Sequence, residues 1–410
     1  MLRFFLSAAL GLAVTGSALA DDDTRQISGA LTYKAKIALP PGAKVTIEAM
    51  GLFDTVLDRA QFTTEGKQVP IDFNLSVPKG IGGQVNAVIR GEGPNGWIVQ
   101  DVPFTAGGGK ADLGPLWMEP LTPLAFATRF DCGGKEVSFG VLDDRASLRL
   151  DGQDYAMTQK VSASGARYHG GADDQIQFWS KGDTAMLTVS GKAYPECTPF
   201  DDSTAPYRAR GNEPGWHVDI GEDAVEVVAQ YGEVTKSAPR PEVVIEAGGY
   251  VFDMPAIGTR LWIEDGLCDD DMSGMPYPHR AVLKLNGQEY RGCGAEARSL
   301  LTGAEWRIED VMGGGVVDGA EVTITFDETG RISGRAACNR YFGGYQLTGE
   351  GVSFGQMAST QMACAPSLMT LERKMLDALG QVQRFDFDET GALLLIGGPQ
   401  DRALLTARRE

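Results

Sequence analysis

The chain has 410 residues, and its 37 Lys and Arg stand against 55 Asp and Glu, which gives a formal net charge of -18. Such a chain is a poor candidate for nucleic-acid binding, because an acidic surface repels phosphate. It favours encounter with cationic proteins, although acidity that serves only solubility fits equally well. The length predicts roughly two to four domains, and the composition along the chain favours four.

The first twenty residues have the order of a cleavable secretory signal. Arg3 precedes the apolar stretch FFLSAALGLAV, and small residues lead to Ala20. Cleavage there removes Arg3 and takes the net charge from -18 to -19. The stretch is too short for a stable anchor, no later segment has about twenty uninterrupted apolar residues, and no cysteine follows the cleavage site to carry a lipid. We therefore expect a soluble periplasmic or secreted protein without a membrane anchor.

Six cysteines in an exported chain predict disulfide bonds. Their order suggests local pairs, each inside one candidate domain, although the sequence alone leaves other connectivities open. The predicted pairs are Cys132 with Cys197, Cys268 with Cys293, and Cys338 with Cys364. Metal binding is the alternative, but the cysteines lack the close spacing and the neighbouring histidines of a zinc site. No metal and no other cofactor is predicted.

Residues 24–118 contain short runs that alternate polar and apolar residues, such as KVTIEAM and VPIDFNLSV, separated by Pro and Gly clusters. Period-two alternation with this punctuation predicts antiparallel strands. The opening SGALTYKAKIALPPGAKVTIEA resembles the YbaY/YscW family of small β-sandwich envelope domains. This resemblance implies the fold and nothing about catalysis.

Residues 126–198 contain strand-like runs such as EVSFGVL and TAMLTVS, bracketed by Cys132 and Cys197. They predict a stapled antiparallel barrel or sandwich. Inside this segment the chain has SGxxY followed by WxKGxxA, formed by Ser164, Gly165, Tyr168, Trp179, Lys181, Gly182 and Ala185. The pattern resembles that of the MliC/PliC inhibitors of c-type lysozyme, a family that keeps a disulfide where Cys132 and Cys197 stand.

The resemblance implies a mode of inhibition. A glycosidase of the lysozyme type flanks the scissile bond with one protonated and one ionised carboxyl group. In the family, the serine and the lysine of the motif enter the cleft and contact these carboxyl groups, which here implies Ser164 and Lys181. A lysine ammonium can form a charge-assisted hydrogen bond with a desolvated carboxylate, and a serine hydroxyl can donate or accept.

The other motif residues have supporting roles by the same resemblance. Gly165 and Gly182 would allow tight turns, while Tyr168 and Trp179 would anchor the loops in the core. The segment HGGADDQIQF that follows Tyr168 is longer than the family's usual spacing. Its acidic residues 173 and 174 would either help to meet a basic lysozyme or obstruct the cleft. The alternative to inhibition is that Ser164 and Lys181 merely occupy exposed hairpin turns.

Residues 207–297 open with YRARGNEPGWHVDI and resemble a little-characterised domain of bacterial envelope proteins, whose function does not come with the resemblance. The residues of distinctive type, for which turn packing is predicted, are Arg208, Asn212, Glu213 and Trp216. The run from Asp269 to Asp271 predicts a solvated acidic loop, because the alternating ligand positions of a calcium loop are absent.

Residues 299–410 begin LTGAEWRIEDV, contain RAACNRYFGGYQL, and resemble a META domain of the HslJ type. From Ser367 to Leu379 apolar residues recur at helical spacing, and Gly380 is placed to end that helix. One helix packed on a small sheet is expected. The predicted fold class is thus mainly β, with several small antiparallel sandwich or barrel domains and a small α+β domain at the C-terminus.

None of the short enzyme motifs in the sequence lies in the local context that its chemistry requires. Residues 91–96 fit GxGxxG but lie between two strand-like runs, which predicts a hairpin turn. Residues 76–79 fit SxxK, yet Pro78 and a strand-like context exclude the required helical turn. The histidines, His169, His217 and His279, are scattered and form neither a triad nor a zinc pattern. No catalytic residue is predicted.

The leading hypothesis is an exported, non-enzymatic protein whose second domain binds and inhibits c-type lysozyme. The alternative, suggested by the first and last domains, is a chaperone-like assembly or stress factor that binds other envelope proteins and ignores lysozyme. An enzyme with an unrecognised site is disfavoured because no acid, base and nucleophile converge in the sequence. Burial of Ser164 and Lys181 inside the sheet would remove the basis of the inhibitor hypothesis.

Overall fold

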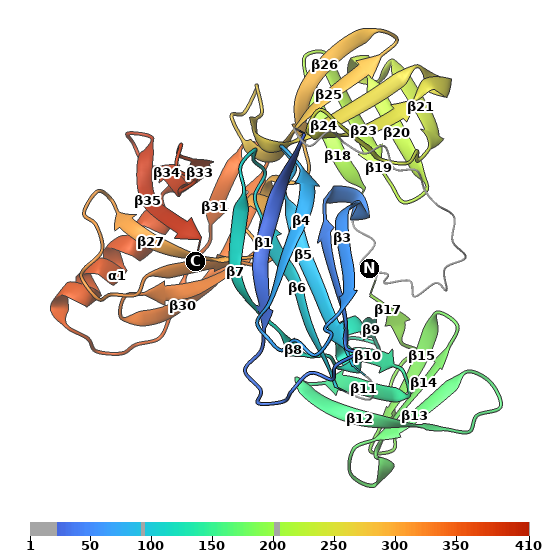
Figure 1. Cartoon of the computed structure of the whole chain (residues 1–410). Coiled ribbons are helices and arrows are strands. Elements are labelled where there is room, and N and C mark those ends of the chain that lie inside the picture. Colours follow the sequence, from blue (N-terminus) through green and yellow to red (C-terminus); the bar gives the residue numbers. More distant parts are fainter. Residues whose placement is uncertain (1–22, 92–94, 201–205, 410) are drawn as a thin grey trace. The chain divides into compact units, whose positions relative to one another are not determined.

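The computed structural model describes residues 23–91, 95–200 and 206–409 (Figure 1). The expected signal, residues 1–20, lies outside the described residues, as do residues 92–94 of the GxGxxG segment. The described chain falls into two compact units, one up to residue 205 and one from residue 206. Strands dominate both units, as the fold-class prediction requires. In this part of the chain every helix is too short or too polar to cross a membrane.

The first unit begins with two sheets, in the strand orders β4-β1-β7 and β3-β2-β5-β6-β8. The strands are β1 (Thr24–Thr32), β2 (Lys44–Met50), β3 (Val56–Thr63), β4 (Ile71–Pro78), β5 (Gly83–Arg90), β6 (Gly96–Phe104), β7 (Ala111–Trp117) and β8 (Glu119–Pro120). Alternate residues, such as Ile27 and Leu31 on β1, enter a shared core, so the predicted sandwich forms. One pair departs from the antiparallel expectation. β1 and β7 are parallel, because the chain crosses from β6 in one sheet to β7 in the other.

The motifs set aside as enzymatic coincidences lie in this sandwich. Strands β5 and β6, which flank the GxGxxG segment, pair antiparallel, as a hairpin requires. Ser76 and Pro78 belong to the extended strand β4, so the SxxK segment is not helical.

The first unit continues as an antiparallel meander in the order β16-β15-β14-β13-β12-β11-β10-β9-β17. The strands are β9 (Thr128–Asp131), β10 (Glu136–Leu142), β11 (Arg145–Leu150), β12 (Gln153–Lys160), β13 (Ala166–Gly170), β14 (Ile176–Lys181), β15 (Thr184–Val189), β16 (Lys192–Ala193) and β17 (Thr198–Pro199). The sheet closes on itself because Cys197, next to β17, exchanges backbone hydrogen bonds of 2.9 and 2.8 Å with Ala185 of β15. The predicted disulfide from Cys132 to Cys197 forms at this seam, the place where the two ends of the sheet meet.

The second unit opens with a sheet in the order β21-β20-β19-β18-β26-β25-β24-β23-β22. The strands are β18 (Tyr207–Asn212), β19 (Gly215–Ile220), β20 (Ala224–Ala229), β21 (Val234–Pro239), β22 (Val244–Glu246), β23 (Gly249–Met254), β24 (Thr259–Asp269), β25 (Pro276–Leu285) and β26 (Gln288–Gly294). The predicted disulfide from Cys268 to Cys293 links β24 to β26.

The distinctive residues of this sheet have structural partners, as turn packing predicts. Arg208 pairs with Asp219, and the indole nitrogen of buried Trp216 donates to the carbonyl oxygen of Arg291 at 3.2 Å. The side-chain amide of Asn212 donates to carboxylates of the acidic loop, Asp270 and Asp271. Glu213 precedes Pro214 in the turn between β18 and β19.

The last segment is a sheet in the order β31-β30-β29-β28-β27-β35-β34-β33, with β32 beside β30. Its elements are β27 (Glu305–Val311), β28 (Thr323–Phe326), β29 (Arg331–Ala336), β30 (Asn339–Thr348), β31 (Gly351–Phe354), β32 (Ala358–Ser359), α1 (Pro366–Leu379), β33 (Val382–Phe387), β34 (Leu393–Gly397) and β35 (Arg402–Arg409). Helix α1 ends before Gly380 and buries Leu371, Met375, Ala378 and Leu379, so its predicted span and face are confirmed. The predicted disulfide from Cys338 to Cys364 forms as well.

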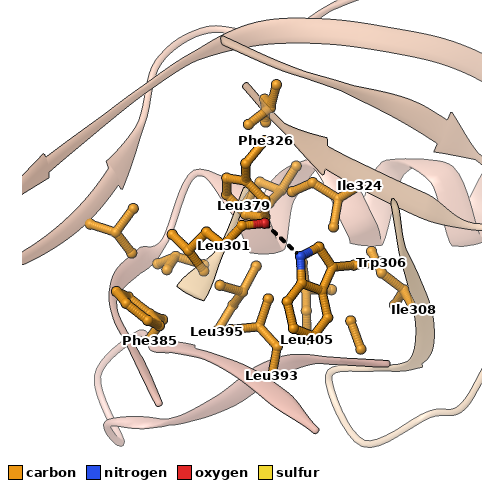
Figure 2. Close-up of a cluster of buried hydrophobic side chains, with 14 of the residues drawn as sticks. Leu301, Trp306, Ile308, Ile324, Phe326, Leu379, Phe385, Leu393, Leu395 and Leu405 are labelled. Carbon is orange, nitrogen blue, oxygen red and sulfur yellow. Dashed lines mark hydrogen bonds between the residues drawn. The ribbon is translucent and has the colours of Figure 1, made fainter. Parts of the chain in front are cut away.

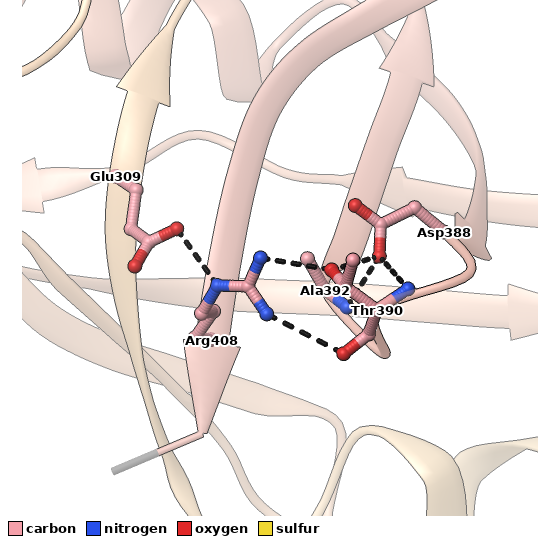
Figure 3. A network of polar contacts seen from close by, with 5 residues as sticks. All are labelled: Glu309, Asp388, Thr390, Ala392 and Arg408. Atoms are coloured by element: carbon pink, nitrogen blue, oxygen red, sulfur yellow. Dashed lines mark hydrogen bonds and ion pairs between the residues drawn. The ribbon is translucent and has the colours of Figure 1, made fainter.

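Two clusters define how this last sheet holds together. In its core the indole nitrogen of Trp306 donates to the carbonyl oxygen of Leu301 at 2.8 Å, amid side chains such as Leu405 (Figure 2). At its surface the Arg408 guanidinium of β35 bonds Glu309 of β27 at 3.0 Å and the hydroxyl of Thr390 at 2.8 Å (Figure 3). The apolar cluster supplies the stability, and the polar one fixes the turn between β33 and β34 to its neighbours.

Candidate functional site

The residues expected to enter a partner's cleft lie on neighbouring loops at one end of the barrel. Ser164 belongs to the loop between β12 and β13, and Lys181 is the last residue of β14. Because the ladder pairs Ala166 with Ser180, the two loops lie side by side. Ser164 and Lys181 are both exposed. The burial that would have removed the basis of the inhibitor hypothesis is therefore not found.

Gly165 lets the two loops approach each other. Its φ of +66° is in the left-handed region, and a Cβ atom there would lie 2.4 Å from the carbonyl oxygen of Ser180 and 3.3 Å from the Cβ of Lys181. Only glycine fits this contact. Gly182 also has a positive φ, of +61°, but a Cβ atom there would meet open space. The first glycine is needed for space and conformation, the second for conformation alone.

Trp179 holds the Ser164 loop in place from the neighbouring strand. Its indole nitrogen donates to the carbonyl oxygen of Ser164 at 2.8 Å, and the hydroxyl of Ser162 donates to the same oxygen at 2.7 Å. The expectation that Trp179 packs in the core is wrong, since Phe178 takes the inward position on β14 and alternation turns Trp179 outward, where it is half-buried. Tyr168 is buried as expected, and its ring centre lies 4.8 Å from that of Phe139.

The longer segment after Tyr168 lies away from these loops. It forms the turn between β13 and β14, where Gly170 pairs with Ile176, whereas Ala166 pairs with Ser180 at the other end of the same ladder. At about 3.4 Å per residue the two ends are roughly 14 Å apart. The Asp174 side chain, however, reaches back to Lys160 at 3.3 Å, and Lys160 is the last residue of β12 and stands opposite Arg167 in the adjoining ladder. The backbone of the acidic turn is thus at the other end of the β13–β14 ladder, whereas its Asp174 carboxylate lies beside the end of β12.

Two cations at the exposed end have no carboxylate partner in the described part of the chain. Among the described residues no carboxylate pairs with Lys181 or with Arg167, whereas Lys135, Arg149 and Lys160 of the same barrel each have one. The Arg167 guanidinium lies over the Trp179 ring, 4.8 Å from its centre. The sequence reasoning missed Arg167, although it stands inside the SGARY motif. This end of the barrel offers a hydroxyl and two cations that no described carboxylate neutralises, a set suited to carboxyl groups.

Three family models match this chain. "Membrane-bound lysozyme-inhibitor of c-type lysozyme" matches residues 130–195, which include the loops just described. "META domain" matches residues 299–410, and "Type III secretion system lipoprotein chaperone (YscW)" matches residues 22–90. These matches confirm the YscW-like, MliC and META parts of the four-domain combination predicted from the sequence.

Curated relatives exist for the barrel. A membrane-bound lysozyme inhibitor of C-type lysozyme from Yersinia enterocolitica is 38% identical over 60 residues, which are 14% of this chain and 49% of that protein. A protein of the same name from Cupriavidus necator is 41% identical over 66 residues, 15% of this chain and 50% of that protein. The chain thus spans about half the length of these relatives.

Solved structures give weaker similarities. An alternative pilotin from the type II secretion system of Vibrio cholerae is 24% identical, with 24% of this chain and 98% of that chain covered and a TM-score of 0.21. A protein from Burkholderia xenovorans, solved by NMR, is 29% identical, with 28% and 86% covered and a TM-score of 0.24. TM-scores this low carry no argument about fold or function.

Proposed function

We propose that the barrel of residues 126–198 binds c-type lysozyme and blocks its active site with Ser164 and Lys181. The observation that carries this proposal is the placement of both side chains, exposed and on adjacent loops, in the segment that matches the lysozyme-inhibitor family. Relatives of this segment bear the name of inhibitors of C-type lysozyme. The whole protein is then a non-enzymatic binding protein of the bacterial envelope, exported with the help of its first twenty residues.

The chemistry follows from what a lysozyme cleft contains. One of its two carboxyl groups is ionised and the other protonated. The Lys181 ammonium, which has no competing carboxylate among the described residues, would pair with the ionised group. The Ser164 hydroxyl would bond the other, because it can donate or accept. Together they occupy the place of catalytic water and of the sugar at the scissile bond.

The supporting contacts reduce the cost of binding. The Ser164 backbone is held by Trp179 and Ser162, and the Gly165 contact fixes this loop against Lys181. A loop already ordered in the free protein loses little conformational entropy on association. The backbone of the acidic turn at residues 171–175 lies at the far end of the ladder, and its Asp174 carboxylate is already paired with Lys160.

A lysis assay tests the function. The purified chain from residue 21 onward should slow the clearing of a bacterial cell-wall suspension by a c-type lysozyme. Ser164→Ala and Lys181→Ala should each weaken inhibition about tenfold, and the double variant should abolish it at concentrations that suffice for the native protein. Lys192→Ala is the matched control, because Lys192 is an exposed lysine of the same barrel at the opposite end of the strands.

The outcomes separate mechanism from function. Full inhibition by the double variant would contradict the two-residue mechanism. Absence of any effect of the native protein on lysozyme would contradict the function itself. Thermal unfolding of each variant should match that of the native protein, since both side chains are exposed.

A second candidate function rests on the match of residues 22–90 to a lipoprotein-chaperone family. In this alternative the protein is an envelope assembly or stress factor that binds other envelope proteins. Pull-down from an envelope extract with and without added lysozyme distinguishes the two. Envelope proteins retained equally in both, together with no retention of lysozyme, would favour the alternative.

A further inference from the structure

The outer face of the barrel next to Lys181 carries a row of side chains on three adjacent strands. The ladders place Arg167 of β13 opposite Trp179 of β14, and Trp179 opposite Met186 of β15. Trp179 and Lys181 lie on the same face of β14, two residues apart. Met186 is therefore a diagonal neighbour of Lys181 on the same exposed surface.

Apolar side chains are unusually exposed around this row. Met186 is 47% exposed, and Val161, on the same loop as Ser164, is 102% exposed. Single exposed apolar residues need no explanation. Here, however, Val161 and Met186 flank the two loops that carry Ser164 and Lys181, and the half-buried Trp179 lies between them.

Two side chains cannot make a stable interface by themselves. A specific complex buries about 800 Å² on each partner. Its strongest contacts are usually surrounded by residues that exclude water from them. A charge pair between Lys181 and a partner carboxylate gains strength only if water is kept away from it. Val161 and Met186, the apolar residues beside Ser164 and Lys181, are positioned to exclude water from such a charge pair.

Arg167 adds a second positive charge to the same surface. Its guanidinium lies on the Trp179 ring and is not paired with a carboxylate of the described residues. A planar guanidinium held on an aromatic ring is ordered in advance and keeps its N–H groups free to bond at its edge. A partner that presents acidic groups around its cleft would complement both Arg167 and Lys181.

We propose that Val161, Arg167 and Met186, here named the collar, form the outer part of the lysozyme interface. The partner is the c-type lysozyme of the proposed function, on which this inference rests. The collar covers the rim of the cleft when Ser164 and Lys181 enter it. Val161 and Met186 exclude water, and Arg167 bonds a carboxyl group at the rim.

Charge insertion at the collar tests this surface. Val161→Glu and Met186→Glu place a carboxylate against the acidic cleft, and each should raise the inhibitor concentration for half-maximal inhibition of a purified c-type lysozyme at least tenfold. Val141→Glu is the matched control, because Val141 is a 45% exposed valine on β10, which β11 and β12 separate from β13, β14 and β15 in the sheet. It should leave that concentration unchanged.

A second variant, with its own control, tests the contribution of Arg167. Arg167→Gln should weaken inhibition several-fold, more at low salt than at high salt, because a charge is lost at a charged interface. The control is Arg145→Gln, at a half-buried arginine of β11, which should leave inhibition unchanged.

The results separate the collar from the proposed function. If the native protein inhibits lysozyme and the Val161 and Met186 variants inhibit it as well as the Val141 variant does, the collar proposal is wrong. The two-residue mechanism then stands. If the native protein does not inhibit lysozyme at all, both fail. Unchanged thermal unfolding of the glutamate variants would show that any loss of inhibition arises at the interface.

Discussion

The indole nitrogen of Trp179 and the carbonyl oxygen of Ser164 are joined by a hydrogen bond of 2.8 Å. The bond links the strand that ends in Lys181 to the loop that carries Ser164. The two residues proposed to enter the lysozyme cleft are therefore positioned by one side chain, which itself lies on the outer face and not in the core.

Trp179→Phe should remove this bond and keep the aromatic ring under Arg167. We expect several-fold weaker inhibition, because the Ser164 loop loses an anchor, and a loss of about 1 kcal/mol in the free energy of unfolding. Titration of lysozyme activity and urea denaturation measure the two effects. Trp117→Phe, at a 54% exposed tryptophan of β7, is the control and should change neither. Equal inhibition by both variants would show that the bond does not position the loop.

Gly165→Ala and Gly182→Ala should differ although both glycines have positive φ. At Gly165 the new methyl group would meet the Ser180 carbonyl oxygen at 2.4 Å, so the loops must separate. At Gly182 it would meet nothing, and only backbone strain of about 1 kcal/mol remains. The first variant should be the less stable in urea and the weaker inhibitor. The reverse order would mean that the contact between the loops is not tight in solution.

The acidic turn should be dispensable for inhibition. Asp173→Asn combined with Asp174→Asn removes two negative charges from the turn between β13 and β14. It also removes the exposed ion pair with Lys160, which is worth less than about 1 kcal/mol. The variant should inhibit lysozyme within about twofold of the native protein, since Lys160 already neutralises the Asp174 carboxylate and both aspartates are exposed to screening by salt. A change of tenfold or more would place this turn in the interface.

Local sequence patterns were enough for part of the structure. Helical spacing predicted Ser367–Leu379, and the helix spans Pro366–Leu379. The motif resemblance singled out Ser164 and Lys181, which the structure places exposed on adjacent loops, while their joint action stays a prediction. The pairing of strands that are far apart in the sequence could not be predicted from local patterns. The parallel pairing of β1 with β7, the closure of the barrel at Ala185 and Cys197, and the position of Met186 beside Trp179 all depend on which strands meet.

The disulfide between Cys132 and Cys197 should make a large contribution to the stability of the barrel. It closes a sequence separation of 65 residues at the seam where Cys197 pairs with Ala185. Replacing both cysteines by alanine should cost about 4 kcal/mol of stability by the loop-closure estimate. Inhibition should then be lost at a lower urea concentration. The double alanine variant of Cys338 and Cys364, which lie in the other unit, should leave the urea dependence of inhibition unchanged.

His279 should make the second unit sensitive to acid. Its Nδ1 lies 3.0 Å from the hydroxyl of Tyr207, and its Nε2 lies 3.3 Å from a carboxylate oxygen of Asp265. Burial lowers the pKa of His279 from 6.5 to about 4. The contacts fit a neutral ring that accepts from Tyr207 at Nδ1 and donates to Asp265 from Nε2.

The sign of the effect follows from where the proton binds first. Below pH 6.5 the unfolded chain takes up a proton at this histidine, whereas the folded protein does so only near pH 4. The stability contributed by the neutral ring is complete above pH 6.5 and is lost as the pH falls toward 4, by up to about 1.4 kcal/mol per pH unit. Urea denaturation of the native protein and of His279→Gln at several pH values should show a flatter dependence for the variant in this window. An imidazole NMR signal of His279 that titrates at or above pH 6.5 would instead mean that the Asp265 carboxylate outweighs burial.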